Sequence, residues 1–213
     1  TSNNTIYGTR CDTPVGCPTS LVCDASSDIL SRPIDIARHG LIYAGAQKNL
    51  GPAGVTIVII RKDLLDRSPK SLPTCLNYRT YSDNQSMYNT PPTLPIYMVR
   101  EVLNWIDASG GLVAMEERNS EKASILYKTI EESKDFYTSP VLPGSRSTMN
   151  VVFRLADSKL EKKFSAEAEA AGFSGLKGHR NVGGFRASIY NAFPREGVVA
   201  LSQFMRDFQS SNS

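Results

Sequence analysis

The chain has 213 residues, of which 40% are hydrophobic and 21% charged, and its formal net charge is +3 at pH 7. Because basic and acidic residues are interspersed and nearly balanced, this charge argues against a nucleic-acid partner. The apolar run over 55–60 is followed at once by charged residues, so no stretch reaches membrane-spanning length. Residues 1–4 lack the basic and apolar regions of a signal peptide, and we expect a cytoplasmic protein.

The first sixty residues predict short strands separated by turns. In chain order we expect a strand end at 5–8, a Pro/Gly/Cys loop over 10–20, a strand over 21–23 ending at Asp24, a polar turn over 24–28, a short helix over 34–38, an apolar run from Leu41 towards Lys48, and a buried strand over 55–60. Three short strands and one short helix cannot cover both faces of a parallel sheet. We therefore expect part of this domain to be missing from the chain or supplied by another polypeptide.

The four cysteines, at positions 11, 17, 23 and 75, do not form a zinc pattern. There is no CxxC, and the two histidines, His39 and His179, are far apart, so no metal site is expected. A Cys11–Cys17 disulfide remains an alternative, but the absence of a secretion signal favours free thiols in a reducing compartment.

Helical periodicity dominates the rest of the chain. The predicted elements are an irregular polar segment over 62–88, helices from 93 to the glycines at 110–111 and over 112–132, a strand over 149–155, a helix over 159–171, a strand over 185–190 and an amphipathic helix over 196–208. This order predicts an α/β protein with a mixed or parallel sheet in residues 1–108 and a smaller α+β domain in residues 109–213.

Lys48 is an unusual residue because it sits at a glycine-rich turn between two apolar segments. Lysine is rarely buried without a partner, and burial lowers its pKa by disfavouring the ammonium. A neutral amine in such a place can attack a carbonyl group and form a Schiff base.

Asp24 offers a possible counterpart to Lys48, since each follows a predicted strand. Ligands of open α/β sheets gather at the carboxyl ends of the strands. A pyridoxal phosphate site needs such a pair, with a lysine for the Schiff base and a carboxylate for the pyridine nitrogen. On spacing alone the alternatives stay open, because Asp24 also fits a turn or cap and Lys48 fits a surface lysine.

Four long segments closely resemble the phosphoserine aminotransferase family: DASSDILSRPID (24–35), YAGAQKNLGPAG (43–54), MYNTPPT (87–93) and GHRNVGGFRASIYNA (178–192). The resemblance runs from Thr5 to the C-terminus. It implies a fold-type I pyridoxal phosphate enzyme, with a partial large domain and a small α+β domain. It also implies a homodimer that transfers an amino group from glutamate to 3-phosphohydroxypyruvate, giving O-phosphoserine and 2-oxoglutarate in serine biosynthesis.

The resemblance implies a cofactor role for six residues. They are Lys48 as the Schiff-base lysine and proton carrier, Asp24 at the pyridinium nitrogen, Thr5 near the ring's phenolic oxygen, Gln47 at the cofactor phosphate, and Asn89 and Thr90 at the phosphate of the partner subunit's cofactor. A simpler reading of Asn89 and Thr90 is that they cap the helix that follows, where Pro91 and Pro92 fit a helix start.

The resemblance implies a substrate role for Arg186, His179 and Arg180. Arg186 would hold the α-carboxylate, for which a planar guanidinium is suited, and His179 with Arg180 would bind the substrate phosphate. His179 could also be a simple turn residue. Arg186 is the hardest to explain structurally, because a guanidinium inside an apolar strand needs an anionic partner.

The sequence departs from the family at its beginning. No glycine-rich phosphate loop and no stacking aromatic precede Asp24, and the one tryptophan, Trp105, lies in a predicted helix. We therefore expect residues 1–213 alone to bind cofactor weakly or not at all, with the missing part lying in a longer parent protein or in a separate chain.

Two alternatives to the proposed enzyme are a non-catalytic fragment and an aminotransferase for another small substrate. The His179-Arg180 pair argues against the latter, since an unphosphorylated substrate gives no reason for it.

Overall fold

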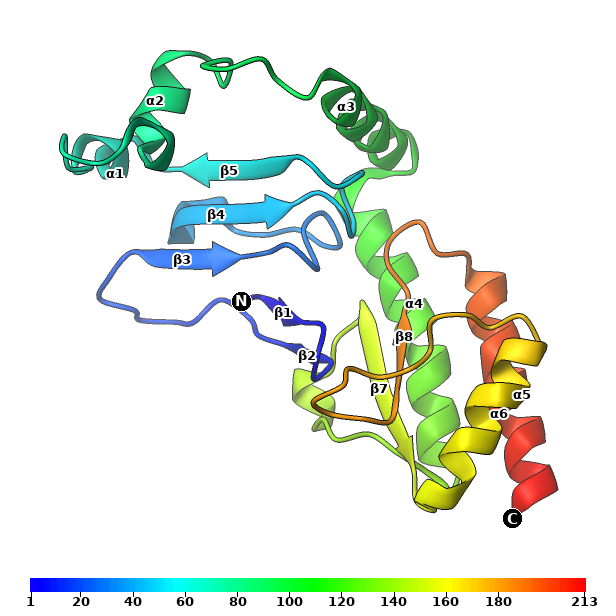
Figure 1. Cartoon of the computed structure of the whole chain (residues 1–213). Helices are drawn as coiled ribbons and strands as arrows, with labels where there is room; N and C mark the ends of the chain where they lie inside the picture. Colours follow the sequence, from blue (N-terminus) through cyan, green and yellow to red (C-terminus); the bar gives the residue numbers. More distant parts are fainter.

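A three-stranded mixed sheet carries the first part of the chain in the computed structural model, which describes residues 1–213 (Figure 1). Strand β3 (Leu21–Asp24) pairs in parallel with β4 (His39–Gly45), and β4 pairs antiparallel with β5 (Thr56–Ile60). The prediction of a mixed or parallel sheet is confirmed, as is the strand ending at Asp24. The strand after Lys48 is present, but the expectation that it is buried is wrong, because it lies at the edge of this sheet and none of its residues is buried. A single 3₁₀ turn, η1 (Ile36–Arg38), replaces the short helix expected over 34–38.

Helices follow β5 in the chain and are drawn above this edge strand in Figure 1. The long one, α3 (Thr93–Ala108), is confirmed, and its Val99 packs with Ala44 and Leu50 in the sheet's hydrophobic cluster. The expectation of an irregular segment over 62–88 is wrong in part. It contains α1 (Lys62–Asp66), the 3₁₀ turn η2 (Thr74–Leu76) and α2 (Tyr78–Asp83), none of which has a buried residue. Without a buried face these helices show no apolar periodicity to detect.

The chain begins with a small hairpin, β1 (Asn3–Asn4) and β2 (Thr9–Arg10), so the strand end expected at 5–8 is wrong. Those four residues form the turn. The Asn4 side chain accepts hydrogen bonds from the amides of Ile6 and Tyr7 at 2.9 and 3.2 Å, as turn-forming asparagines do. Gly8 closes the turn at φ +70°, where a Cβ atom would lie 2.8 Å from the Asn150 carbonyl.

The second half of the chain packs helices against an antiparallel sheet of β6 (Tyr137–Thr138), β7 (Asn150–Leu155) and β8 (Phe185–Ser188). Helices α4 (Gly111–Glu132), α5 (Glu161–Ala170) and α6 (Arg195–Asn212) are confirmed, with ends shifted by a few residues. Phe153 and Phe185 stack in this core, and Phe164 packs against both. The sequence did not reveal β6, because two residues are too short to show alternation.

Two hydrophobic clusters result, one formed by residues between 23 and 99 and the other by residues between 123 and 208. The domain boundary at 108/109 stays a prediction. None of the helices is long and apolar enough to cross a membrane. The four cysteines are unbonded, with Cys23 buried and the others exposed.

A buried lysine of α4 anchors the segment that follows β8. Lys122 of α4 is 3% exposed and donates hydrogen bonds to the carbonyls of Ile189, Tyr190, Asn191 and Phe193 at 2.7–3.4 Å. Burial lowers the pKa of Lys122 to about 8, so the ammonium persists at neutral pH and holds the segment that follows β8.

Candidate active site

Asp24 and Lys48 lie at the same edge of the mixed sheet. Strands β3 and β4 run in parallel, Asp24 is the last residue of β3, and Lys48 lies in the turn that follows β4. The carboxyl ends of parallel neighbours meet at one edge, which is where open α/β sheets bind ligands. The expected juxtaposition of a carboxylate and an amine is therefore present.

The Asp24 carboxylate is held by the turn that follows it. Its Oδ1 accepts a hydrogen bond from the Ser26 amide at 2.9 Å, and the Ser26 hydroxyl accepts one from the Gly45 amide at 3.0 Å. Burial acts to raise the pKa of Asp24, but hydrogen bonding from Ser26 and the nearby phenol of Tyr43 outweigh it and leave the pKa below its ordinary value. Asp24 is therefore an anion at neutral pH.

Ser26 and Tyr43 are site residues that the sequence did not single out. The Asp-x-Ser spacing is a detectable signal, since aspartates often bond the amide two residues on. Tyr43 gave no such signal, because only the pairing of β3 with β4 places it opposite Asp24. The charge of Asp24 is the main reason that the pKa of the Tyr43 phenol is raised.

The Lys48 side chain is half-buried, in the turn over 46–50. Burial lowers the pKa of its amine, Arg186 lowers it further, and Asp24 acts in the opposite direction. These three charged groups therefore lie close enough to influence one another, although 138 residues separate Lys48 from Arg186 along the chain. Gln47 beside it is exposed and folds over Gly45, where a Cβ atom would lie 2.6 Å from the Gln47 Oε1.

Arg186 of β8 has a side-chain hydrogen-bond donor without an acceptor. Its Nη1 donates to the Thr5 carbonyl at 3.0 Å, while its buried Nε has no acceptor. Buried donors are nearly always paired, so an unpaired one in a native protein calls for an explanation. A bound carboxylate would supply it, because its two oxygens match the guanidinium fork. Thr5 contacts the site through its backbone carbonyl.

His179 and Arg180 lie in the loop before β8. His179 is half-buried and its Nδ1 accepts a hydrogen bond from the Asn181 amide at 3.2 Å, whereas Arg180 is exposed. The loop closes tightly at Gly178, where a Cβ atom would lie 2.1 Å from the Gly183 carbonyl oxygen. The pair makes no hydrogen bond or ion pair with Lys48 or Arg186, and its role stays a prediction.

Asn89 and Thr90 are exposed in the segment before α3. The Asn89 side chain bonds only the Thr90 carbonyl, at 3.2 Å. The reading of these residues as a helix cap is wrong, since the cap position of α3 is Pro92 and carries no side-chain hydrogen bond. Their expected role, at the partner subunit's cofactor, stays a prediction.

Comparisons with known proteins place the chain in one family. The model of the aminotransferase class-V family matches residues 16–201. A phosphoserine aminotransferase from Lysinibacillus sphaericus is 60% identical over 213 residues, which is all of this chain and 59% of that protein.

Solved structures extend the similarity to three dimensions. Phosphoserine aminotransferase from Bacillus circulans subsp. alkalophilus superposes with a TM-score of 0.96 and 55% identity, covering 100% of this chain and 59% of that one. The PLP-bound phosphoserine aminotransferase from Trichomonas vaginalis gives a TM-score of 0.90 and 42% identity, covering 96% and 58%. The chain thus spans about three fifths of the length of these relatives.

Proposed function

The chain belongs to the class-V aminotransferase family, and from this premise we propose that its protein transfers an amino group from glutamate to 3-phosphohydroxypyruvate, giving O-phosphoserine and 2-oxoglutarate in serine biosynthesis. Its α/β architecture is the fold-type I arrangement of the solved phosphoserine aminotransferases. The proposal draws on relatives of that name at 52–60% identity that match essentially the whole chain.

One observation of this structure carries the proposal. Asp24 is anionic, Lys48 carries an amine whose pKa is lowered by burial and by Arg186, and Arg186 has a buried Nε without an acceptor. Pyridoxal phosphate and an amino-acid substrate match these groups, since the ring nitrogen needs an anion, the aldehyde needs an amine, and the α-carboxylate needs a fork of donors. The residues present therefore fit the cofactor.

The chain's residues would divide the chemistry as follows. When bound, pyridoxal phosphate supplies an aldehyde and a ring that draws electrons from the substrate Cα. Asp24 would keep the ring nitrogen protonated, and Arg186 would hold the α-carboxylate. The Lys48 amine would hold the cofactor and then take a proton from the substrate Cα and return it, for which a pKa below the ordinary range is favourable.

The other assigned residues would orient the two phosphates. We assign Gln47 to the cofactor phosphate and Thr5 to the ring edge, with Asn89 and Thr90 acting on the partner subunit's cofactor. His179 and Arg180 would take the substrate phosphate, because an always-charged guanidinium beside an imidazole provides donors for its oxygens. These assignments rest on the sequence resemblance.

Exposed side chains support two further parts of the proposal, a homodimer and a cytoplasmic location. Helix α3 leaves Leu94, Tyr97 and Met98 at 67%, 53% and 45% exposure, and apolar surface of this kind is commonly covered by a partner. The exposed thiols of Cys11, Cys17 and Cys75 fit a reducing compartment. The two hydrophobic clusters fit a boundary at 108/109 between a large-domain portion and a small α+β domain.

An acceptor comparison tests the proposed reaction. The protein produced from its complete gene, loaded with pyridoxal phosphate, should convert glutamate to 2-oxoglutarate with 3-phosphohydroxypyruvate as acceptor, and only poorly with hydroxypyruvate. His179→Ala and Arg180→Ala should each reduce that preference. Equal rates with both acceptors would instead indicate an aminotransferase for another small substrate, and absence of cofactor uptake would indicate a non-catalytic protein.

The pH dependence of cofactor uptake should report the charges around Lys48. Because only the neutral amine attacks an aldehyde, the uptake rate of the apoenzyme should rise with pH through a midpoint below the ordinary value of 10.5. Arg186→Gln removes a positive charge and should move the midpoint up, whereas Asp24→Asn should move it down. Stopped-flow absorbance measures the rate, and a midpoint that neither variant shifts would contradict the assigned charge cluster.

A further inference from the structure

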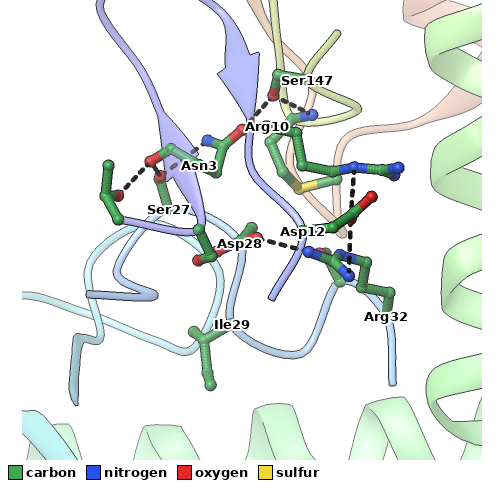
Figure 2. Close-up of polar contacts among 12 residues, drawn as sticks. Asn3, Arg10, Asp12, Ser27, Asp28, Ile29, Arg32 and Ser147 are labelled. Atoms are coloured by element: carbon green, nitrogen blue, oxygen red, sulfur yellow. Dashed lines mark hydrogen bonds and ion pairs between the residues drawn. The ribbon is translucent and has the colours of Figure 1, made fainter. Parts of the chain in front are cut away.

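Asn3 is a buried polar residue that the proposed chemistry does not use. It is 4% exposed, and it contacts Ser27, Ser147 and Asn150, which are 4%, 0% and 0% exposed (Figure 2). An amide at such a depth costs free energy unless its hydrogen bonds are made, so its surroundings show what holds it.

Both polar atoms of the Asn3 side chain form hydrogen bonds. The Nδ2 group donates to the Ser27 hydroxyl at 2.8 Å and to the Asn150 Oδ1 at 3.0 Å, while Oδ1 accepts a hydrogen bond from the Ser147 hydroxyl. The Asn3 carbonyl also accepts from the Ser27 hydroxyl at 2.8 Å. Hydrogen bonds are directional, so this arrangement fixes three segments of the chain in one relative geometry.

One of these segments carries a site residue, and another pairs with a strand that does. Ser27 belongs to the turn that begins at Asp24. Asn150 of β7 is paired with Ser188 of β8, the strand of Arg186, and its Nδ2 donates to the Ser188 hydroxyl at 3.1 Å. An unbroken run of hydrogen bonds therefore extends from the turn of Asp24, through Asn3 and Asn150, to the strand of Arg186.

The hairpin of Asn3 also holds Arg186 directly. Thr5, two residues after Asn3, supplies the carbonyl that accepts from the Arg186 Nη1. The Ser147 amide donates to the Gly8 carbonyl at 2.9 Å, which holds the same hairpin against the segment before β7. A shift of the hairpin would therefore move the one acceptor that orients the guanidinium.

We propose that Asn3 is a positioning residue that sets Arg186 at its distance from Asp24 and Lys48. This inference rests on the proposed function, in which Arg186 holds the substrate carboxylate. Ion pairs next to the hairpin stabilise it more weakly: Arg10 and Arg32 meet Asp12 at 3.5 and 3.6 Å, but the Asp12 side chain is 69% exposed (Figure 2). Asp12, two residues after β2, therefore provides a nearby control.

The experiment uses the complete gene product loaded with pyridoxal phosphate. Asn3→Ala should raise the KM for glutamate about tenfold and weaken binding of the unreactive dicarboxylate glutarate by a similar factor, because small misplacements of a binding group are costly. Cofactor uptake should match that of the wild type. Asp12→Asn should leave the KM, glutarate binding and cofactor uptake unchanged.

A double-mutant cycle distinguishes positioning from general stability. If Asn3 acts through Arg186, Asn3→Ala should have little further effect on KM in an Arg186→Lys background, so the two changes are not additive. Effects that simply multiply would overturn the inference, as would a loss of thermal stability with unchanged KM and unchanged glutarate binding.

A milder variant keeps the inference testable if Asn3→Ala fails to fold. Ser27→Ala removes only the hydrogen bonds between Asn3 and the turn of Asp24. It should raise KM less than Asn3→Ala does, and a normal KM in this variant would refute the inference. A wild-type protein without transamination activity would instead refute the proposed function itself.

Discussion

Replacing Lys48 by alanine is expected to lower kcat for transamination by about 10⁴-fold, the upper range for loss of a proton-transfer group. The variant loses both the amine that holds the cofactor and the group that moves the Cα proton. No neighbouring residue replaces it, since the other charged groups acting on Lys48 are the Asp24 carboxylate and the Arg186 guanidinium, and neither is an amine. Steady-state rates with glutamate and 3-phosphohydroxypyruvate measure the loss.

The matched control for this prediction is Lys62→Ala. Lys62 begins α1, is exposed and forms no ion pair, so its loss should leave kcat within a factor of about two, as is usual for surface changes. Equal activity of Lys48→Ala and the wild type would remove Lys48 from the mechanism. Equal loss in both variants would point to a nonspecific effect of removing a lysine.

Arg186→Lys is expected to lower kcat/KM for glutamate about 100-fold, or about 2.7 kcal/mol of transition-state stabilisation. The substitution keeps the positive charge, so charge alone predicts little change. What it removes is the planar fork, including the unpaired Nε that would meet the carboxylate while Nη1 stays on the Thr5 carbonyl. A lysine ammonium cannot make both contacts with that geometry.

Arg206→Lys provides the control for this substitution. Arg206 lies on the exposed side of α6 and meets Glu132 at 3.4 Å, a surface pair of small energetic value. It should retain wild-type kinetics. Near-normal kcat/KM in Arg186→Lys would contradict the carboxylate role, whereas loss of cofactor uptake in that variant would show that Arg186 supports cofactor binding instead.

The strands that lead to Asp24 and to the turn of Lys48 could be predicted because short apolar runs end at polar or glycine-rich turns. Helices α3 and α4 could be predicted because each has a buried face with apolar residues at helical spacing. The hairpin of Asn3 and strand β6 could not, since strands of two residues carry no alternation.

The site could be predicted only in part, for a related reason. Asp24 and Lys48 are brought together by local strand pairing, which sequence patterns report. The approach of Arg186 to Lys48 depends on how β7 and β8 pack against the first part of the chain. The partners of Asn3 lie 24 to 147 residues away, and no local pattern encodes contacts at that separation.

Covalent capture of the cofactor tests the central claim most directly. The complete gene product is loaded with pyridoxal phosphate, reduced with borohydride and digested, and the modified peptide is identified by mass spectrometry. The account predicts one pyridoxyl group per chain, on Lys48, and none on that peptide in Lys48→Ala. A modification confined to another lysine, or no modification of a folded protein at saturating cofactor, would contradict it.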